Sequence, residues 1–348
     1  MPTSGELIST IKALAKAEGF AALAIASAGE APRAEAYHRW IAQGWHGGMS
    51  YMEKNMPQRL RPDVLVPGAK SVICLAVGYG ESVFSPSALI ARYACGRDYH
   101  KVLKRRCIAM MDRLRHVIPQ FDGRAFVDSA PVMERSLAAS CGLGFIARNG
   151  CLVVPGMGSY VLLCEIVCNL ELEAGTPLKD TCGDCGRCQA ACPTNAIRAG
   201  NLIDSRRCIS YLTIEHAGEI PPEFWPRMGT RIFGCDACQQ ACPLNESNNG
   251  YAPQCHSQID AELAPREDVR NLNLASVLKW TPADWDIFTR GSALRRATFG
   301  MFIRNAIIAA GNSGDRSLIE LLHALRAEHP SRGVMIDWAI DRLKEDSP

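Results

Sequence analysis

Two short segments of this 348-residue chain are dense in cysteine, and each ends in Cys-Pro. The first has the spacing C-x2-C-x2-C-x3-C-P, and the second has the spacing C-x2-C-x3-C-P. With the first spacing, three thiolates can bind one iron-sulfur cube while the fourth reaches a second cube. One cluster therefore predicts another, and Cys208, which lies between the segments, supplies the thiolate that the second segment lacks.

The exchange of the fourth ligand assigns eight thiolates to two crossed [4Fe-4S] clusters. One cluster is predicted to bind Cys182, Cys185, Cys188 and Cys242. The other is predicted to bind Cys192, Cys208, Cys235 and Cys238. Two structural zinc sites are the alternative, because zinc also binds four thiolates, but the third thiolate of C-x2-C-x2-C would crowd a tetrahedral site. The cysteines outside both sets that we interpret as packing residues are Cys74, Cys107, Cys141, Cys151, Cys164, Cys168 and Cys255.

The composition is that of an ordinary globular protein. Apolar residues make up 47% of the chain, enough for a substantial core, and the length predicts two or three domains. The first ten residues lack the basic and apolar regions of an export signal, and no apolar run approaches the ~20 residues of a membrane span. We therefore expect a cytoplasmic protein with reduced thiols and no membrane contact.

The first part of the chain, residues 1–175, mixes helical and strand patterns. Thr3 and Glu6 fit a capping box for a helix that ends near Gly19. Apolar runs at residues 20–26, 70–78 and 160–170 predict strands. We expect helices packed on a sheet, and an α+β fold for the whole chain.

Two further domains are predicted after residue 175. Residues 176–260 form the cluster domain, with helical turns at 195–198 and 211–216, and residues 261–348 form a helical domain without cysteine. In this last domain, apolar residues recur with helical spacing from Leu294 to Ala310, from Leu318 to Leu325 and from Val334 to Leu343. HEAT-like helical hairpins and a single terminal bundle packed on the cluster domain both fit this pattern.

A basic stretch lies between Arg92 and Arg115, although the net charge of +2 does not by itself indicate nucleic acid binding. The stretch has eight Lys and Arg residues against two Asp. Its apolar residues follow helical spacing, and they are Leu103, Cys107, Met110, Leu114 and Val117. A solvated helix face and a phosphate-binding patch are equally compatible with this pattern.

Asp128 is the most suggestive acid in the first domain. It follows the apolar residues Ala125 to Val127 and precedes a Ser-Ala-Pro turn, so it could project into a pocket and donate a proton. The alternative, favoured by local sequence alone, is an N-cap for a helix starting near Pro131. The sequence contains neither the G-x-G-x-x-G of a dinucleotide fold nor the D-x-H-x-x-G of a histidine-ligated corrinoid, and spacing alone names no second cofactor.

Five segments together resemble the epoxyqueuosine reductase family. They are residues 67–73, 91–100, 127–135, 208–215 and 233–243, in this order, and they span most of the chain. The strings CISYLTIE and GCDACQQACP are the most specific, because a generic two-cluster domain has no reason to carry the first between its cysteine segments.

The resemblance implies a function that the spacing did not. Such enzymes use cobalamin and two [4Fe-4S] clusters to remove the epoxide oxygen from epoxyqueuosine at the tRNA wobble position, the last step of queuosine biosynthesis. It also implies a reductive-dehalogenase-like cobalamin-binding α/β domain, a ferredoxin-like domain and a HEAT-like C-terminal domain. The cobalamin is expected base-off, reduced from cob(II)alamin to cob(I)alamin by electrons that pass through the clusters.

Four residues outside the cluster ligands receive roles by this resemblance. Asp128 is the expected proton donor, and burial against the corrinoid is expected to raise its pKa toward neutrality. Cys95, Asn149 and Ser210 are expected near the cobalamin, together with Asp128.

The expected partners are a tRNA that carries epoxyqueuosine in its anticodon loop and a small electron donor such as ferredoxin or flavodoxin. The basic helix and Arg295, Arg296 and Arg304 are candidate phosphate contacts, and we expect a monomer. Two alternatives remain: a reductive dehalogenase-like corrinoid enzyme, and an electron-transfer module of the ferredoxin type whose first domain only binds a partner.

Overall fold

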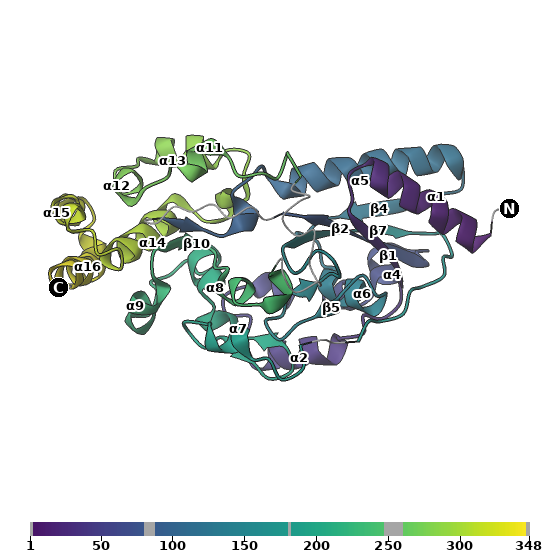
Figure 1. Ribbon diagram of the computed structural model, residues 1–348, viewed down its shortest axis with the longest axis horizontal. Coiled ribbons are helices and arrows are strands. Elements are labelled where there is room, and N and C mark those ends of the chain that lie inside the picture. Colours follow the sequence, from purple (N-terminus) through teal and green to yellow (C-terminus); the bar gives the residue numbers. More distant parts are fainter. Residues whose placement is uncertain (1–2, 80–87, 180–181, 247–259, 346–348) are drawn as a thin grey trace.

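The computed structural model describes residues 3–79, 88–179, 182–246 and 260–345. A four-stranded antiparallel sheet forms the middle of the first part of the chain (Figure 1). Its strands, in spatial order, are β1 (Ala22–Ser27), β2 (Ser71–Gly78), β7 (Val161–Cys168) and β4 (Gly123–Phe126). Strands β1, β2 and β7 lie in the runs in which the sequence predicted strands.

Helices cover both faces of this sheet. Helices α1 (Ser4–Ala17) and α5 (Tyr99–Val117) pack on one face, and α6 (Glu134–Ser140) packs on the other (Figure 1). The predicted capping box of α1 is confirmed, since Thr3 and Glu6 exchange both hydrogen bonds. The spacing in α5 correctly predicted four buried residues, Leu103, Cys107, Met110 and Leu114, but Val117, the last residue of the helix, is 58% exposed.

A helical excursion connects β1 to β2 and reaches the cluster segment. It consists of α2 (Ala34–Ala42), α3 (Met56–Leu60) and α4 (Pro62–Leu65). The Trp40 indole N–H donates to the carbonyl of Ile203, and the Ser205 N–H donates to the carbonyl of Trp45. These bonds join the start of the chain to residues that precede Cys208.

The segment with the cluster cysteines consists of short elements. They are α7 (Arg187–Ala190), β8 (Ile197–Arg198), β9 (Leu202–Ile203), α8 (Ile209–Ile214), α9 (Trp225–Met228), β10 (Arg231–Phe233) and α10 (Ala237–Gln240). The helical turn predicted at 195–198 is wrong: β8 and β9 form a hairpin, because Gly200 and Asn201 adopt the positive φ of a tight turn. The helical turn predicted around residue 211 is confirmed by α8.

A parallel strand pair fastens the first part of the chain to the cluster segment. Strand β3 (Leu89–Ile90) pairs with β10, and the Ala91 N–H donates to the carbonyl of Phe233 at 2.8 Å. The next N–H, of Arg92, donates to the Asp236 carboxylate at 2.8 Å. The loop that leads into α5 is therefore held directly against the second cysteine segment. Two further short strands, β5 (Phe145–Ile146) and β6 (Leu152–Val153), form a separate hairpin.

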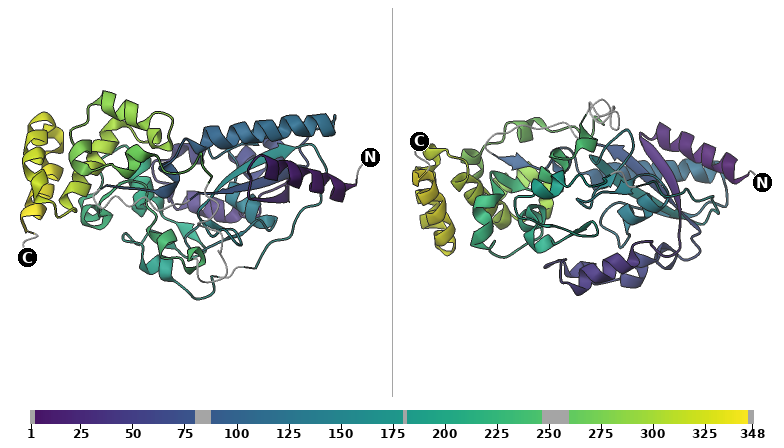
Figure 2. Two further views of the ribbon diagram at one scale, coloured as in Figure 1. Left: turned by 45° about the horizontal axis from the view of Figure 1, so that its top comes forward. Right: turned by 60° about the horizontal axis from the view of Figure 1, so that its bottom comes forward.

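The C-terminal part is helical, and its end lies opposite the N-terminus (Figure 2). Its helices are α11 (Glu267–Arg270), α12 (Leu274–Val277), α13 (Pro282–Thr289), α14 (Phe299–Gly311), α15 (Ile319–Glu328) and α16 (Gly333–Glu345). The helix predicted from Leu294 is interrupted, because Thr298 caps the start of α14 with its side chain. Helix α14 packs against α16 and also against α8 and β10 of the cluster segment.

No helix among the described residues combines the length and the apolar character that crossing a membrane requires.

Candidate active site and cluster ligands

Asp128 lies just beyond the end of β4 in a strained backbone conformation. Its φ of 53° is in the left-handed region that residues other than glycine rarely adopt. The hydroxyl of Tyr99 donates to its Oδ2 atom at 2.8 Å, and Nε2 of His100 lies 3.1 Å from the same oxygen. The carboxylate side chain is nevertheless 58% exposed, so it can meet a molecule from outside.

The capping interpretation of Asp128 is wrong. Helix α6 begins at Glu134, six residues later, and its N-cap is Met133, which makes no side-chain cap bond. The hydrogen bonds of Asp128 instead join β4 to the first turn of α5.

His100 connects two carboxylates. Its Nδ1 atom lies 2.8 Å from Oδ1 of Asp98, and its Nε2 atom contacts Asp128. Burial lowers the pKa of His100, but hydrogen bonds to Asp128 and Asp98 raise it more, so the net shift is upward. Burial likewise raises the pKa of Asp128, yet hydrogen bonds from His100 and Tyr99 lower it overall. The two shifts together favour an ion pair between His100 and Asp128, and the expected upward shift of the Asp128 pKa is absent in the protein alone.

The carboxyl group with a pKa near neutrality is Glu134 instead. Burial raises its pKa to about 7, helped by the negative charge of Asp128. Glu165 on β7 is fully buried beside it, and burial together with the charge of Glu134 raises the pKa of Glu165 well above its usual range.

Residues from three parts of the chain surround the open side of Asp128. Tyr93 packs edge-on against Tyr99, and Arg296 lies over the ring of Tyr51 while its guanidinium binds Glu215 at 2.7 and 2.8 Å. Burial raises the pKa of Tyr51, and the charges of Glu215, Arg296 and Asp128 also act on it. Of these residues the sequence analysis had singled out Arg296 alone, although Tyr93 and Tyr99 lie within residues 91–100, a segment that carries the family resemblance.

Three residues expected near the cobalamin occupy different environments. Cys95 is fully buried, and its thiol is directed at the carbonyls of Ile90 and Ala91, so the expectation that it faces an open cavity is wrong. Asn149 is 5% exposed and contacts the carbonyl of the cluster ligand Cys238 at 3.4 Å. Ser210 is half-buried in the first turn of α8, two residues after Cys208.

The eight cluster cysteines fall into two neighbourhoods. Burial raises the pKa of Cys242 to about 11, and the thiols that add to this shift are Cys182, Cys188 and Cys185. Burial raises the pKa of Cys208 to about 12, with contributions from Cys235 and Cys192. The pKa of Cys238 is raised first by a hydrogen bond with Cys151 and by burial, with contributions from Cys208 and Cys235. This grouping is compatible with the two crossed sets, which stay a prediction.

Backbone N–H groups at helix starts face several of these thiols. They hydrogen bond to Cys188 at α7, to Cys208 at α8 and to Cys235 at α10. Such donors stabilise thiolates and tune cluster potentials. Among the described residues, no three His, Cys, Asp or Glu side chains are close enough to hold a single metal ion, so the grouping rests on the mutual influence of the thiols.

Much of the basic stretch is paired within the chain. Arg105 and Arg106 bind Glu262, and Arg106 also binds Asp260. Arg97 lies 3.4 Å from Glu262, and Arg113 lies 3.2 Å from Glu18. This part of α5 therefore holds residues 260–262 in place, which reduces the charge left for phosphate.

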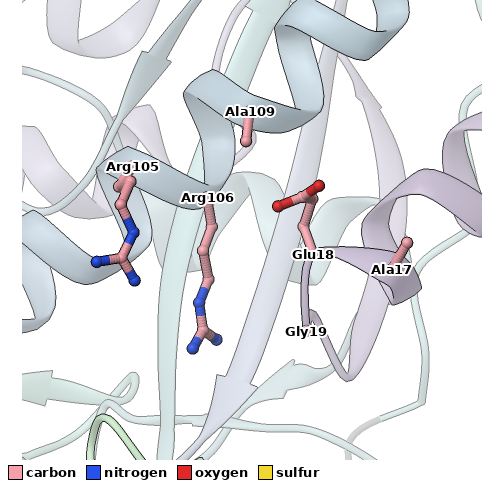
Figure 3. Close-up of a pocket in the computed structure, with 6 residues that line it drawn as sticks. All are labelled: Ala17, Glu18, Gly19, Arg105, Arg106 and Ala109. Carbon is pink, nitrogen blue, oxygen red and sulfur yellow. The ribbon is translucent and has the colours of Figure 1, made fainter.

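A cavity lies next to these arginines, and Asp128 does not line it. It has a volume of 410 Å³ and is lined by Ala17, Glu18, Gly19, Arg105, Arg106 and Ala109 (Figure 3). The end of α1 and one turn of α5 form its walls, and the site chemistry described above takes no part in it.

Arg304 was a candidate phosphate contact, and the structure contradicts this. It is 2% exposed, and its guanidinium donates to the carbonyls of Leu212, His216 and Gly218 and to the side chain of Asn305. Burial lowers its pKa to about 10. Arg304 is thus a structural residue that joins α14 to the end of α8. Arg295 and Arg296 remain partly exposed, although Asp286 and Glu215 pair with them.

Replacing Arg304 with Ala is expected to destabilise the protein by roughly 3 kcal/mol or more, because it leaves buried carbonyls without donors. The measurement is the Tm of the cluster-loaded protein. Arg295→Ala, whose side chain is 44% exposed, is the matched control and should change the Tm little. Equal shifts for the two variants would contradict a structural role for Arg304.

Fold and cysteine spacing together indicate an iron-sulfur redox protein, with the Asp128–His100 pair at the edge of a sheet. Two family models match: "4Fe-4S double cluster binding domain" over residues 181–245, and "Epoxyqueuosine reductase QueG, DUF1730" over residues 59–129. The first match contains all eight predicted cluster ligands.

Similar proteins extend the match to nearly the whole chain. The epoxyqueuosine reductase of Aliivibrio fischeri is 36% identical over 96% of this chain and 91% of its own length. That of Xanthomonas campestris is 37% identical over 97% of each chain. The chain therefore belongs to the epoxyqueuosine reductase family.

Solved structures agree. A crystal structure of epoxyqueuosine reductase with an epoxyqueuosine-modified tRNA-Tyr stem loop superposes with a TM-score of 0.87, at 27% identity, covering 98% of this chain and 91% of that one. The Bacillus subtilis enzyme, in a structure whose catalytic aspartate loop is swung out of the active site, gives a TM-score of 0.85 at 28% identity, covering 98% and 91%.

The site fits the cofactors of this family. The two thiol neighbourhoods provide four cysteines for each of two clusters. A base-off cobalamin is expected to bind without a histidine ligand to cobalt. Carboxylates engage both ring nitrogens of His100, so the histidine at this site is not available to ligate cobalt.

Proposed function

We propose that this protein reduces epoxyqueuosine in the anticodon loop of tRNA to queuosine. The observation that carries the proposal is the pairing of Asp128 with His100 at an exposed position beside the two-cluster segment. Converting an epoxide to an alkene and water takes two electrons and two protons. A proton donor next to an electron-transfer chain is what this reaction requires.

The proton side of the reaction belongs to Asp128 and His100. Asp128 lies outermost, and we assign it the contact with the epoxide oxygen. His100, whose pKa is raised by its hydrogen bonds to Asp128 and Asp98, can pass a proton to Asp128 through their 3.1 Å contact, while Asp98 keeps the imidazole oriented. Tyr99 fixes the carboxylate with a second hydrogen bond.

The electron side depends on groups that the cysteines and the neighbouring surface would hold. Cobalamin, when bound, would supply a strongly reducing cobalt centre next to the substrate. Asp128, Asn149 and Ser210 are the residues that would lie against it. The cysteine set that contains Cys182 and Cys242 would be the one open to an electron donor, because Cys185 is the exposed thiol of the eight.

Substrate tRNA would approach the side on which Asp128 is exposed. Tyr51 and Arg296 lie at this opening and offer a ring and a guanidinium for a base or phosphate. Since much of α5 is paired internally, we expect only part of the basic stretch to contact tRNA. We further propose that the protein is a cytoplasmic monomer that receives electrons from ferredoxin or flavodoxin. Its three proposed domains are residues 1–175, 176–260 and 261–348.

The test is an anaerobic assay of the protein loaded with iron, sulfide and cobalamin. Its substrate is a tRNA anticodon stem loop carrying epoxyqueuosine, and the nucleosides are read by mass spectrometry. We expect loss of one oxygen mass that requires both cobalamin and reductant. No conversion by fully loaded protein would refute the assignment, and conversion without cobalamin would refute its cofactor.

A further inference from the structure

Two carboxyl groups meet in the protein interior directly behind Asp128. Glu165 lies on β7, in register with Phe126 of β4 and Cys74 of β2, and its side chain has no exposed surface. Glu134 is the first residue of α6, the helix that covers this face of the sheet. The helix and the strand therefore bring the two side chains together at the sheet edge where Asp128 emerges.

Within the described residues, neither oxygen of Glu165 has a hydrogen-bond donor. A buried ionised carboxylate without donors is strongly unfavourable, and two neighbouring carboxylates cannot both ionise in such a place. One proton shared between Glu134 and Glu165 removes both problems, because the protonated group donates to the other. The pair then carries a single negative charge.

Glu134 also contacts Asp128 itself. Its Oε1 atom accepts the backbone N–H of Asp128 at 2.5 Å. This bond is made to the residue whose backbone is strained, with a φ of 53°. A carboxyl fixed on one side by Glu165 can hold that N–H, and with it the strained conformation.

We propose that one proton shared between Glu134 and Glu165 holds the Asp128 backbone in the conformation that turns its carboxylate toward Tyr99 and His100. Glu134 and Glu165 are positioning residues, because Glu134 acts through the Asp128 N–H and Glu165 acts through Glu134. The role of this arrangement in catalysis rests on the proposed function, whereas the shared proton itself does not.

The shared proton makes stability depend on pH. The pKa of Glu134 is about 7 in the folded chain against an ordinary value of 4.5, so the folded state binds more protons between these values. Stability from this source is therefore lost as the pH rises from about 4.5 to 7. The titratable and charged groups around the pair are Asp128, Arg135, Tyr99, Cys74, Cys107 and Cys164. The pKa values of Cys74 and Cys164 are raised, so these two thiols stay neutral in this range.

The experiment compares the cluster-loaded native protein with Glu134→Gln and Glu165→Gln between pH 5 and pH 8. A Gln side chain mimics the protonated carboxyl and cannot lose a proton. We expect the Tm of each variant to rise relative to the native Tm as the pH increases. The control is Glu171→Gln, at a carboxylate that is 84% exposed, which should follow the native protein. The infrared band of a protonated carboxyl should be present in the native protein at neutral pH and lost in both variants.

Turnover separates positioning from simple packing. Glu134→Ala removes the acceptor of the Asp128 N–H, and we expect kcat to fall roughly tenfold with a smaller change in KM. Glu134→Gln keeps an amide oxygen at this place and should restore most of kcat. Variants that follow the native Tm at every pH, or a native protein without the infrared band, would overturn the proposal. Because Tm and infrared need no substrate, they stand even if the assay on epoxyqueuosine fails.

Discussion

Replacing Asp128 with Asn is expected to slow turnover by roughly 10² to 10⁴-fold, the usual range for losing a general acid. Asn has nearly the same shape, so the clusters and the fold should be retained. It cannot carry a proton, however, and it leaves the proton on His100 one contact away from the substrate. The measurement is the single-turnover rate of epoxide loss, with iron content and cobalamin absorbance recorded on the same sample.

The matched control for this variant is Asp63→Asn. Asp63 pairs with Arg61 near α4 and lies outside the site, so its replacement should leave turnover as in the native protein. If Asp128→Asn turned over within threefold of the native rate, Asp128 would lose its assigned role and His100 would become the candidate donor.

Removing two cluster ligands from one set should spare the other cluster, and this tests the crossed assignment. In the double variant Cys182→Ala with Cys242→Ala, both losses fall in one set, so about four of eight iron atoms per chain should remain. In Cys182→Ala with Cys192→Ala, the losses fall in different sets, and nearly all iron should go. Turnover should be abolished in both variants.

Iron analysis and electron paramagnetic resonance of the reconstituted variants provide the measurement. An uncrossed arrangement, in which each segment binds its own cluster, would exchange the two results: Cys182 with Cys192 would then spare a cluster. Zinc in place of iron after purification without reconstitution would instead favour the alternative of structural zinc sites.

Sequence reasoning reached the cluster ligands because their chemistry lies in local spacing. The strands at residues 70–78 and 160–170 were equally accessible, since both are largely buried runs of mostly apolar residues. The relay through His100 was not, because its partners Asp98 and Asp128 are 30 positions apart and only the fold brings them together. Nor could spacing reveal that Arg304 is buried, since an arginine within an apolar helix has the same pattern whether it faces solvent or a set of carbonyls.

The family resemblance supplied what spacing could not, and it also misled. It drew attention to Asp128 as a site residue, whereas local sequence favoured a helix cap that the structure does not contain. It placed Cys95 at an open cavity, but the loop folds so that this thiol faces its own backbone. The upward pKa shift that was expected for Asp128 occurs at Glu134 instead. Hydrogen bonds from His100 and Tyr99 lower the pKa of Asp128, whereas burial raises the pKa of Glu134.

Because of the strand pair β3–β10, the geometry of the substrate site depends on cluster assembly. Asp236 accepts the Arg92 N–H and lies between the predicted cluster ligands Cys235 and Cys238. The loop that contains Arg92 continues within a few residues to Tyr99 and His100. The contact between Arg92 and Asp236 joins residues more than 140 positions apart, so forming it costs chain entropy. The folded cluster segment must offset this cost. In a chain without its clusters, we expect that Tyr99 and His100 do not hold Asp128 in place. Such a chain would neither retain tRNA nor expose a reactive site before it can complete the reduction.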